Sequence, residues 1–291
     1  GALQLAFLLH AVWRNGIRLL PTAAGWGSAL ARTVWRNTGV GAIGVGAVQI
    51  NLVLDNWLAY WAAPWAPAAI SYAERLVYLP LGVVATAFAT VLLPTLSGQF
   101  AHRDADGAKR TLATSVEDVL VLTIPAAAGL MLLSRDVVAV LYQGGEFTAQ
   151  DTVHVSRALI CYAPGLLVFS LNKVLTPWFH AQKDTKTPMQ IALAMVGANL
   201  ALNILMVLTL PDGWKHAGIA SSTVACSLAS CVWLAREASR RNGRMGLRAL
   251  AKPALRMAAA AGAMAIAVLL VRSGVHAAME PGRLAALAVV G

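Results

Sequence analysis

The chain has 291 residues, of which 58% are hydrophobic and 12% are charged, and its mean hydropathy is +0.65. Soluble domains carry about 25% charged residues, so this composition excludes an ordinary soluble globular protein. A net charge of +10 in a soluble protein would suggest a nucleic-acid partner. Here the basic residues lie in short segments between apolar stretches. We therefore predict a membrane protein with no nucleic-acid partner.

Apolar stretches of spanning length recur along the chain. A helix needs about 20 residues to cross the hydrocarbon core, whereas barrel strands have about 10 residues of alternating polarity. These stretches are longer and do not alternate, so we predict an all-α polytopic helix bundle with two partial spans, at 1–9 and from 283 on. Both ends fall in apolar runs, and we expect a fragment of a longer protein. About seven full spans are predicted, at 37–60, 68–97, 112–133, 152–180, 188–210, 217–235 and 253–272.

Basic residues are distributed unequally between alternate loops. Loops 10–36, 98–111, 181–187 and 236–252 contain fifteen Lys and Arg residues, whereas the loops of the opposite side contain four. The positive-inside rule places the first set in the cytoplasm, as in a multi-pass protein of the bacterial inner membrane. Loop 10–36 also has three Trp residues and no acidic residue. It suits either contact with anionic membrane lipids or an ordinary cytoplasmic loop with aromatic anchors.

Two adjacent charges, Glu74 and Arg75, lie inside the apolar stretch 68–97. A charge within a span costs about 2–3 kcal/mol and is a functional candidate by default. Neighbouring residues of a helix point about 100° apart, so the two do not simply pair. Arg75 shares its face with polar and aromatic residues, so we expect it to line a hydrated cavity and to bind phosphate through its fork of donors. Glu74 is expected on a more apolar face. The alternative is a buried ion pair that fixes helix packing.

A third charge, Lys173, lies in the stretch 152–180 close to Pro177. It either faces the same cavity as a substrate-binding residue or extends toward an interface. Pro80 and Pro177 are expected to kink their helices. Enzyme motifs are thin, since the sequence has no HExxH, no GxSxG, no P-loop and no CxxC pair, and a transporter is favoured over an enzyme.

Polar residues, one of them charged, occur in pairs in three spans, and in two of these spans the pair is four positions apart. Such residues commonly form interhelical hydrogen bonds, but oxygen atoms from several helices also suit a hard cation such as Na⁺. Apart from this candidate coupling ion, no cofactor is expected. The residues concerned are Asn51 and Asp55, Asn199 and Asn203, and Ser222 and Thr223.

Several segments resemble one known family. They read SYAERLVYLPLGVVATAFATVLLPTLS, GGEFTAQDT followed by RALICYAPGL, NKVLTPWFHAQKDTKTP and KHAGIASS. In this order, from about residue 1 to residue 272, the chain resembles the lipid II flippase family of peptidoglycan synthesis (MurJ, also called MviN). That family is part of a superfamily of multidrug and lipid-linked oligosaccharide exporters.

The resemblance implies a fold of fourteen helices in two lobes around a central cavity. This chain would then begin in the sixth helix and end in the fourteenth. Residues 1–36 would be the end of helix six and a basic cytoplasmic loop, and residues 37–235 would be helices seven to twelve of the C-terminal lobe. Residues 236–252 would be a second basic cytoplasmic loop, and residues 253–291 helix thirteen and the start of helix fourteen.

The resemblance also implies a function, the flipping of lipid II from the inner to the outer leaflet by alternating access. Cell-wall synthesis or division proteins are implied as further partners. Glu74 and Arg75 match an acidic residue and an arginine of the family's eighth helix, and the arginine would engage the lipid diphosphate. The alternatives are another exporter of the superfamily, for lipid-linked oligosaccharides or drugs, and a membrane-embedded enzyme acting on polyprenyl-diphosphate sugars.

A sodium site known in some members of the family has counterparts in this sequence. Because its second eleventh-helix position can be Asp and is Asn203 here, one negative charge is lost relative to that site, which weakens the case for sodium coupling. The implied ligands are Asp55, Asn199, Asn203 and Ser222.

Overall fold

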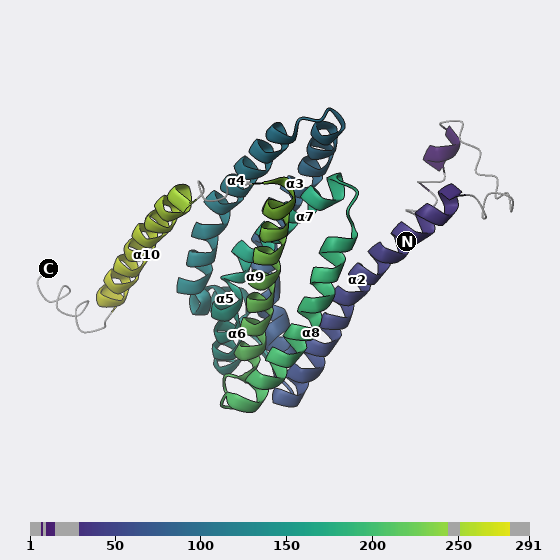
Figure 1. Cartoon of the computed structure of the whole chain (residues 1–291). Helices are drawn as coiled ribbons and strands as arrows, with labels where there is room; N and C mark the ends of the chain where they lie inside the picture. Colours follow the sequence, from purple (N-terminus) through teal and green to yellow (C-terminus); the bar gives the residue numbers. More distant parts are fainter. Residues whose placement is uncertain (1–6, 8–9, 15–28, 244–250, 280–291) are drawn as a thin grey trace, which may run out of the picture. The chain divides into compact units, whose positions relative to one another are not determined.

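The computed structural model describes residues 7, 10–14, 29–243 and 251–279. The chain divides into two compact units, residues 1–42 and 43–291, and the packing of α3 to α10 lies within the second. Every named element in the described ranges is a helix, which confirms the predicted all-α class (Figure 1). The helices are α2 (Ala29–Ala62), α3 (Ala66–Ala101), α4 (Ala105–Leu132), α5 (Ser134–Tyr142), α6 (Ala149–Tyr162), α7 (Gly165–Ala181), α8 (Lys186–Thr209), α9 (Lys215–Asn242) and α10 (Ala251–Met279).

Membrane-spanning character is confirmed for most of the predicted spans. Among the described residues, α4, α8, α9 and Pro253–Val271 of α10 are long and apolar enough to cross a membrane, and the pair α6–α7 is a fifth if it counts as one span. The predicted spans 37–60 and 68–97 lie within α2 and α3. The partial spans predicted at 1–9 and from 283 on fall outside the described residues, apart from Phe7.

The predicted span 152–180 is broken into α6 and α7, which meet at an angle of 43° next to Pro164. A proline inside a helix removes a backbone donor and its ring clashes with the preceding turn. The break at Pro164 was not predicted, and Pro177, where a kink was predicted, lies within α7. Pro80 likewise lies within α3, which continues through it.

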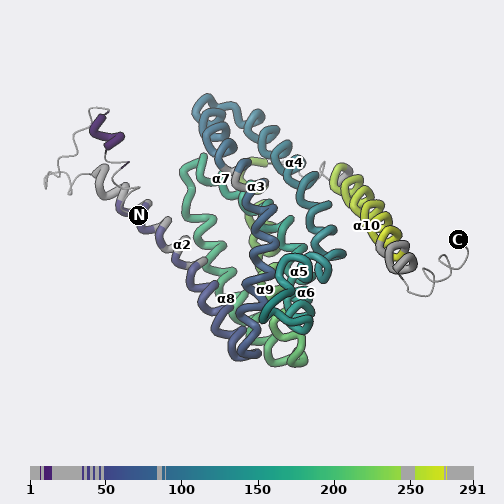
Figure 2. Tube along the Cα trace, turned by 180° about the vertical axis from the view of Figure 1, so that it is seen from behind, coloured from purple at the N-terminus to yellow at the C-terminus, as the bar shows by residue number. Residues whose placement is uncertain are grey.

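Helix α3 packs against α4, α6, α7 and α9, while α10 packs against α4 (Figures 1 and 2). Helices α8 and α9 pack closely along each other. Gly218 permits this approach, because a Cβ atom at that position would lie 2.4 Å from a side-chain atom of Leu210 and 2.9 Å from the Cβ of Met206.

Buried apolar side chains form two clusters, one after the other along the helices. The first joins the N-terminal half of α3 to α6 and the start of α9, and it includes Leu76, Leu81, Leu159, Leu166 and Ile219. The second joins the end of α3 to α4, α7 and the later part of α9, and it includes Leu96, Leu112, Trp178, Ile191 and Leu234. Polar side chains of α7 and α9 that lie between the clusters are therefore placed at mid-helix depth.

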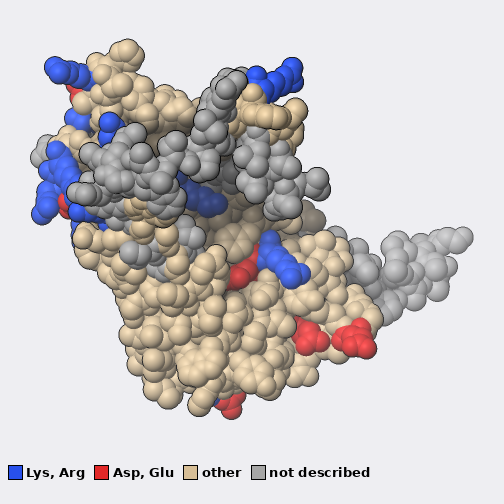
Figure 3. Space-filling model, turned by 90° about the vertical axis from the view of Figure 1, so that its right-hand side faces the viewer, with Lys and Arg blue, Asp and Glu red and all other residues tan. Residues whose placement is uncertain are grey.

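Basic connections share one end of the bundle. In Figure 1 the α3–α4 connection, the α7–α8 connection and the C-terminal end of α9 lie at the upper end, as the alternation of the loops predicted. Figure 3 shows several Lys and Arg side chains grouped toward that end and a broad uncharged area below them. The basic residues of these connections and helix ends include Arg103, Lys183, Lys186, Arg240 and Arg241.

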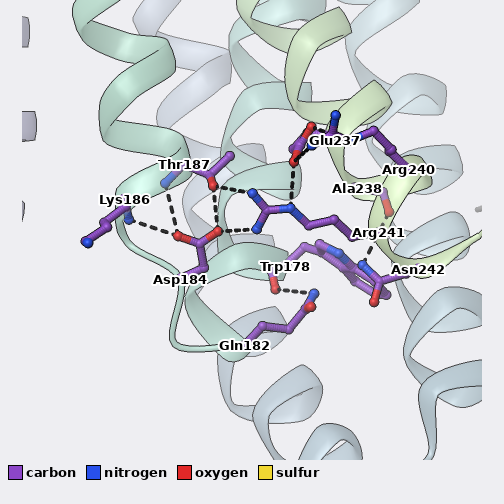
Figure 4. Close-up of polar contacts among 10 residues, drawn as sticks. All are labelled: Trp178, Gln182, Asp184, Lys186, Thr187, Glu237, Ala238, Arg240, Arg241 and Asn242. Atoms are coloured by element: carbon purple, nitrogen blue, oxygen red, sulfur yellow. Dashed lines mark hydrogen bonds and ion pairs between the residues drawn. The ribbon is translucent and has the colours of Figure 1, made fainter.

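A polar network fixes this end of the bundle (Figure 4). The Asp184 carboxylate accepts hydrogen bonds from the backbone N–H groups of Lys186 and Thr187, both 3.0 Å, and so caps the start of α8. Arg241 of α9 donates to Asp184 (2.5 Å) and to the Thr187 hydroxyl (2.9 Å). It also donates to Glu237 of its own helix (2.6 Å). The network thus ties the end of α9 to the start of α8.

Replacing Asp184 tests the strength of this network. Partial burial alone would raise the pKa of the Asp184 carboxyl, but hydrogen bonds from Thr187 and Arg241 outweigh burial and hold the pKa below its usual range. The stabilisation is therefore present above the ordinary carboxyl range and is lost as the pH falls through the lowered pKa. We expect Asp184→Ala to lower the free energy of unfolding by about 1–2 kcal/mol and Asp184→Asn by less.

The measurement is denaturant unfolding of the full-length protein in detergent, as a function of pH. Asp106→Ala is the matched control, because Asp106 forms only an exposed pair with Lys109 on its own helix. An equal loss in the two alanine variants, or a loss for Asp184→Ala that is the same at acidic and neutral pH, would contradict the assignment.

Candidate ion and substrate site

A cavity of about 240 Å³ opens between α2, α3, α7, α8 and α9. On α7 and α9 its walls fall between the two apolar clusters, near the middle of the helices. Buried polar groups at mid-span depth mark ion and substrate pathways in membrane proteins. The polar residues that line the cavity are Asn51, Asp55, Glu74, Tyr78, Asn172, Asn199, Thr223, Ser227 and Ser230.

Asp55, 6% exposed, is the centre of a polar cluster in this cavity. Its carboxylate accepts hydrogen bonds from the side-chain amides of Asn51 (3.0 Å) and Asn203 (2.5 Å) and from the Thr223 hydroxyl (3.4 Å). With its amide nitrogen turned toward Asp55, Asn199 donates to the same carboxylate at 2.8 Å. Helices α2 and α8 thus bring together three of the four predicted ion-site residues, Asp55, Asn199 and Asn203.

The predicted fourth member, Ser222, is not part of this cluster. Its hydroxyl is buried and donates to the Gly218 carbonyl one turn earlier (3.0 Å). Thr223, the next residue, contributes the hydroxyl instead. Helical spacing contains the signal that sequence reasoning missed, because Thr223, Cys226, Ser227 and Ser230 form one stripe of α9 and all line the cavity.

Glu74 and Arg75 point in different directions, as predicted, and it is Glu74 that lines this cavity. Glu74 lines the cavity and accepts a hydrogen bond from the buried Tyr162 hydroxyl (3.0 Å). Arg75 is exposed, its guanidinium carbon lies 5.5 Å from the centre of the Tyr72 ring, and it is not among the described residues that line this cavity.

The apolar face of α3 that carries Glu74 explains why its side chain points into the bundle. Burial of that face turns it toward the bundle interior, since apolar area removed from water is stabilising, and the carboxylate is carried inward with it. The apolar residues of the face, each 5% exposed or less, are Ile70, Val77 and Leu81.

Two further charged residues, Lys173 and Arg157, lie within the predicted span 152–180. Lys173 is exposed on α7 and is not among the described residues lining the cavity, so the structure does not bring it to the ion cluster. Arg157 of α6, which sequence reasoning overlooked, donates to the Gly213 carbonyl (3.0 Å) and lies 4.9 Å from the centre of the Trp214 ring. It holds α6 to the α8–α9 connection. Both Arg157 and Tyr162 lie in the segment RALICYAPGL, which pointed to a family but not to these contacts.

The donor set at Asp55 suits a hard monovalent cation better than a transition metal. Among the described residues, no group of three His, Cys, Asp or Glu side chains is placed to hold a metal ion. Carboxylate, amide and hydroxyl oxygens are ligands of hard cations. One carboxylate would balance one positive charge.

Comparisons with known proteins give one consistent result. Residues 1–290 match the family model described as "Lipid II flippase MurJ". The chain is 35% identical over 187 residues to the probable lipid II flippase MurJ of Rickettsia prowazekii, covering 64% of this chain and 36% of the relative. It is 34% identical over 214 residues to that of Vibrio cholerae, covering 70% and 39%. The chain therefore spans less than half the length of these relatives.

A solved structure agrees with the sequence relatives. The structure described as "Lipid II flippase MurJ, inward closed conformation" matches with a TM-score of 0.67 and 25% identity. The match covers 78% of this chain and 46% of that one. The fold is thus that of part of a lipid flippase.

Removing the Tyr162 hydroxyl tests the buried contact with Glu74. We expect Tyr162→Phe to lower the free energy of unfolding of the full-length protein by about 1 kcal/mol, because a half-buried acceptor loses its donor. Tyr142→Phe is the control, since Tyr142 packs against Tyr72 through its ring and its hydroxyl has no hydrogen bond among the described residues. Denaturant unfolding in detergent measures both, and equal effects would show that the hydroxyl contact is unimportant.

Proposed function

The chain belongs to the lipid II flippase MurJ family, and we propose that it forms the C-terminal part of a transporter that moves lipid II from the inner to the outer leaflet of the bacterial inner membrane. Its relatives are named as flippases, which are transporters rather than enzymes. Alternating access between two lobes is the mechanism we propose, with this chain supplying one lobe. Contacts with cell-wall synthesis or division proteins remain part of the proposal.

The exposed position of Arg75 inside α3 is the observation that carries this proposal. It is an exposed cation well inside α3, and the neighbouring exposed side chains on that helix include apolar Leu79 and Val83. An arginine at membrane depth is costly against lipid, so such residues face water or another part of the protein. A guanidinium offers paired donors that fit phosphate oxygens. We therefore assign Arg75 to the lipid diphosphate, on the surface that faces the transport pathway.

Substitution of Arg75 tests this assignment in the full-length gene. Arg75→Ala should abolish complementation of a flippase-depleted strain, because the diphosphate loses its bidentate partner. Arg75→Lys should also fail, since an ammonium offers no fork of donors. Arg135→Ala, an exposed cation at the start of α5, is the control and should complement.

Membrane insertion of each variant is checked by fractionation, so that loss of growth can be assigned to transport. Growth of the Arg75→Ala strain at the wild-type rate would refute the diphosphate assignment.

We further propose that the Asp55 cluster binds Na⁺ and couples it to transport. Asn51 and Asn203 direct their amide nitrogens at Asp55, and Asn199 can do the same. Rotating these amides about their last side-chain bond would present oxygen atoms without moving the backbone. Asn203 in place of an acid leaves one carboxylate in the cluster, which balances one Na⁺.

Adjacent hydroxyls of α9 provide a matched test of the sodium proposal. Thr223→Ala should abolish the increase in melting temperature that Na⁺ gives to the full-length protein, because a ligand oxygen is lost. Ser222→Ala should keep the increase, since its hydroxyl bonds only the Gly218 carbonyl. Choline chloride at the same ionic strength replaces NaCl in the reference sample. A sodium shift that survives in Thr223→Ala and in Asp55→Asn would reject the site.

A further inference from the structure

The cavity between α2, α3, α7, α8 and α9 holds a second carboxylate that the Asp55 cluster does not use. Both Asp55 and Glu74 line it, and none of the described residues lining it is Lys, Arg or His. Two carboxylates that share a low-dielectric space oppose each other's ionisation. The cavity therefore requires positive charge from outside the side chains that line it.

The two carboxylates differ in how their oxygens are held. Asp55 accepts from Asn51, Asn203 and Thr223, and several donors to one carboxylate favour its ionised form. Glu74 accepts from Tyr162 alone, through one oxygen. Its second oxygen has no hydrogen-bond partner among the described residues. Of the two, Glu74 has the fewer hydrogen-bond donors.

One further hydrogen-bond acceptor in the cavity lacks a donor. The Asn172 side chain uses its amide nitrogen to bond the Ser227 carbonyl (3.0 Å), and its oxygen is buried without a partner. An unpartnered buried acceptor costs free energy. This second observation, independent of the two acids, indicates that the cavity is built to receive a proton or another cation.

We propose that Glu74 is a proton-binding residue of this cavity. It takes one proton from water in the cavity and becomes a neutral carboxylic acid, while Asp55 stays ionised among its amides. The cavity then carries a single negative charge, which one Na⁺ at Asp55 would neutralise. The inference rests on the proposed function only in assigning the proton to a transport cycle, and proton binding itself is measured without transport.

Among the described residues, the helices around Glu74 bring no basic side chain into the cavity that could replace this proton. Titratable side chains reach the cavity or Glu74 from α2 (Asp55), α6 (Tyr162), α9 (Cys226) and α3 itself (Tyr78). Helix α7 contributes Phe169 and Asn172, which do not titrate, and its Lys173 is exposed. Among the described residues, α4 contributes no lining residue.

Because Glu74 is next to Arg75 on α3, its protonation also bears on substrate binding. Glu74 and Arg75 are adjacent on α3, one facing the cavity and the other facing outward. Protonation removes a negative charge next to the guanidinium. A diphosphate bound at Arg75 would then meet less negative charge on α3 when Glu74 is protonated.

Infrared difference spectroscopy of the purified full-length flippase in sodium-free buffer tests the proposal, with pH as the variable. We expect a carboxylic-acid C=O band at neutral pH that disappears on alkaline titration and is absent in Glu74→Gln. Tyr162→Phe should move the band to higher frequency, because a C=O group that accepts a hydrogen bond stretches at lower frequency.

Glu117→Gln is the matched control. Glu117 is a half-buried glutamate of α4 that does not line the cavity, so its variant should keep the band. No band in the wild type, or a band that persists in Glu74→Gln, overturns the proposal. So does a band that is lost in Asp55→Asn and kept in Glu74→Gln. These outcomes are independent of complementation by Arg75 variants, which tests the flippase function separately.

Discussion

A carboxylate buried halfway along the spans imposes the main constraint on this structure. Asp55 is stable there only if polar groups from other helices reach it, because burying an unpaired charge in a low dielectric is very costly. Asn199, Asn203 and Thr223 meet this requirement from α8 and α9. Their reach fixes how α8 and α9 are placed along α2.

The two apolar clusters follow from the same constraint. Each lies to one side of the polar cavity, so apolar packing holds the helices together on both sides of it. Close packing of α8 on α9 at Gly218 shortens the distance that the amides and hydroxyl must cover. A wider separation would leave Asp55 with donors from its own helix alone. Packing and polar bonding are therefore mutually dependent.

Helix α3 connects the two kinds of site that the family suggested. One of its faces is buried and carries Glu74 into the cavity, and the next residue, Arg75, points away from it. A rotation or shift of α3 would change the surroundings of both residues together. The polar network at Arg241 lies at the end of α9 and restrains the connection between α7 and α8, so motion of α3 would occur against a fixed frame.

Sequence patterns predicted the class of fold and the approximate positions of the long helices, because spanning length and apolar composition are local properties, but not the short helix α5 or the break between α6 and α7. The cluster of Asp55, Asn199 and Asn203 was also predictable, through polar residues four apart. The inward direction of Glu74 was not, since it depends on which face of α3 the rest of the bundle covers. Tyr162 was beyond prediction for the same reason, since its contact with Glu74 joins residues 88 positions apart.

The long separation of Asp55 from its partners bears on how the protein enters the membrane. Asn203 follows Asp55 by 148 positions and Thr223 by 168. When α2 is made, Asn51 on the same helix is the nearest donor available to Asp55. An aspartate at the centre of a span opposes insertion by about 2.5–3.5 kcal/mol. The donors that α8 and α9 bring to Asp55 are therefore absent until those helices have been made.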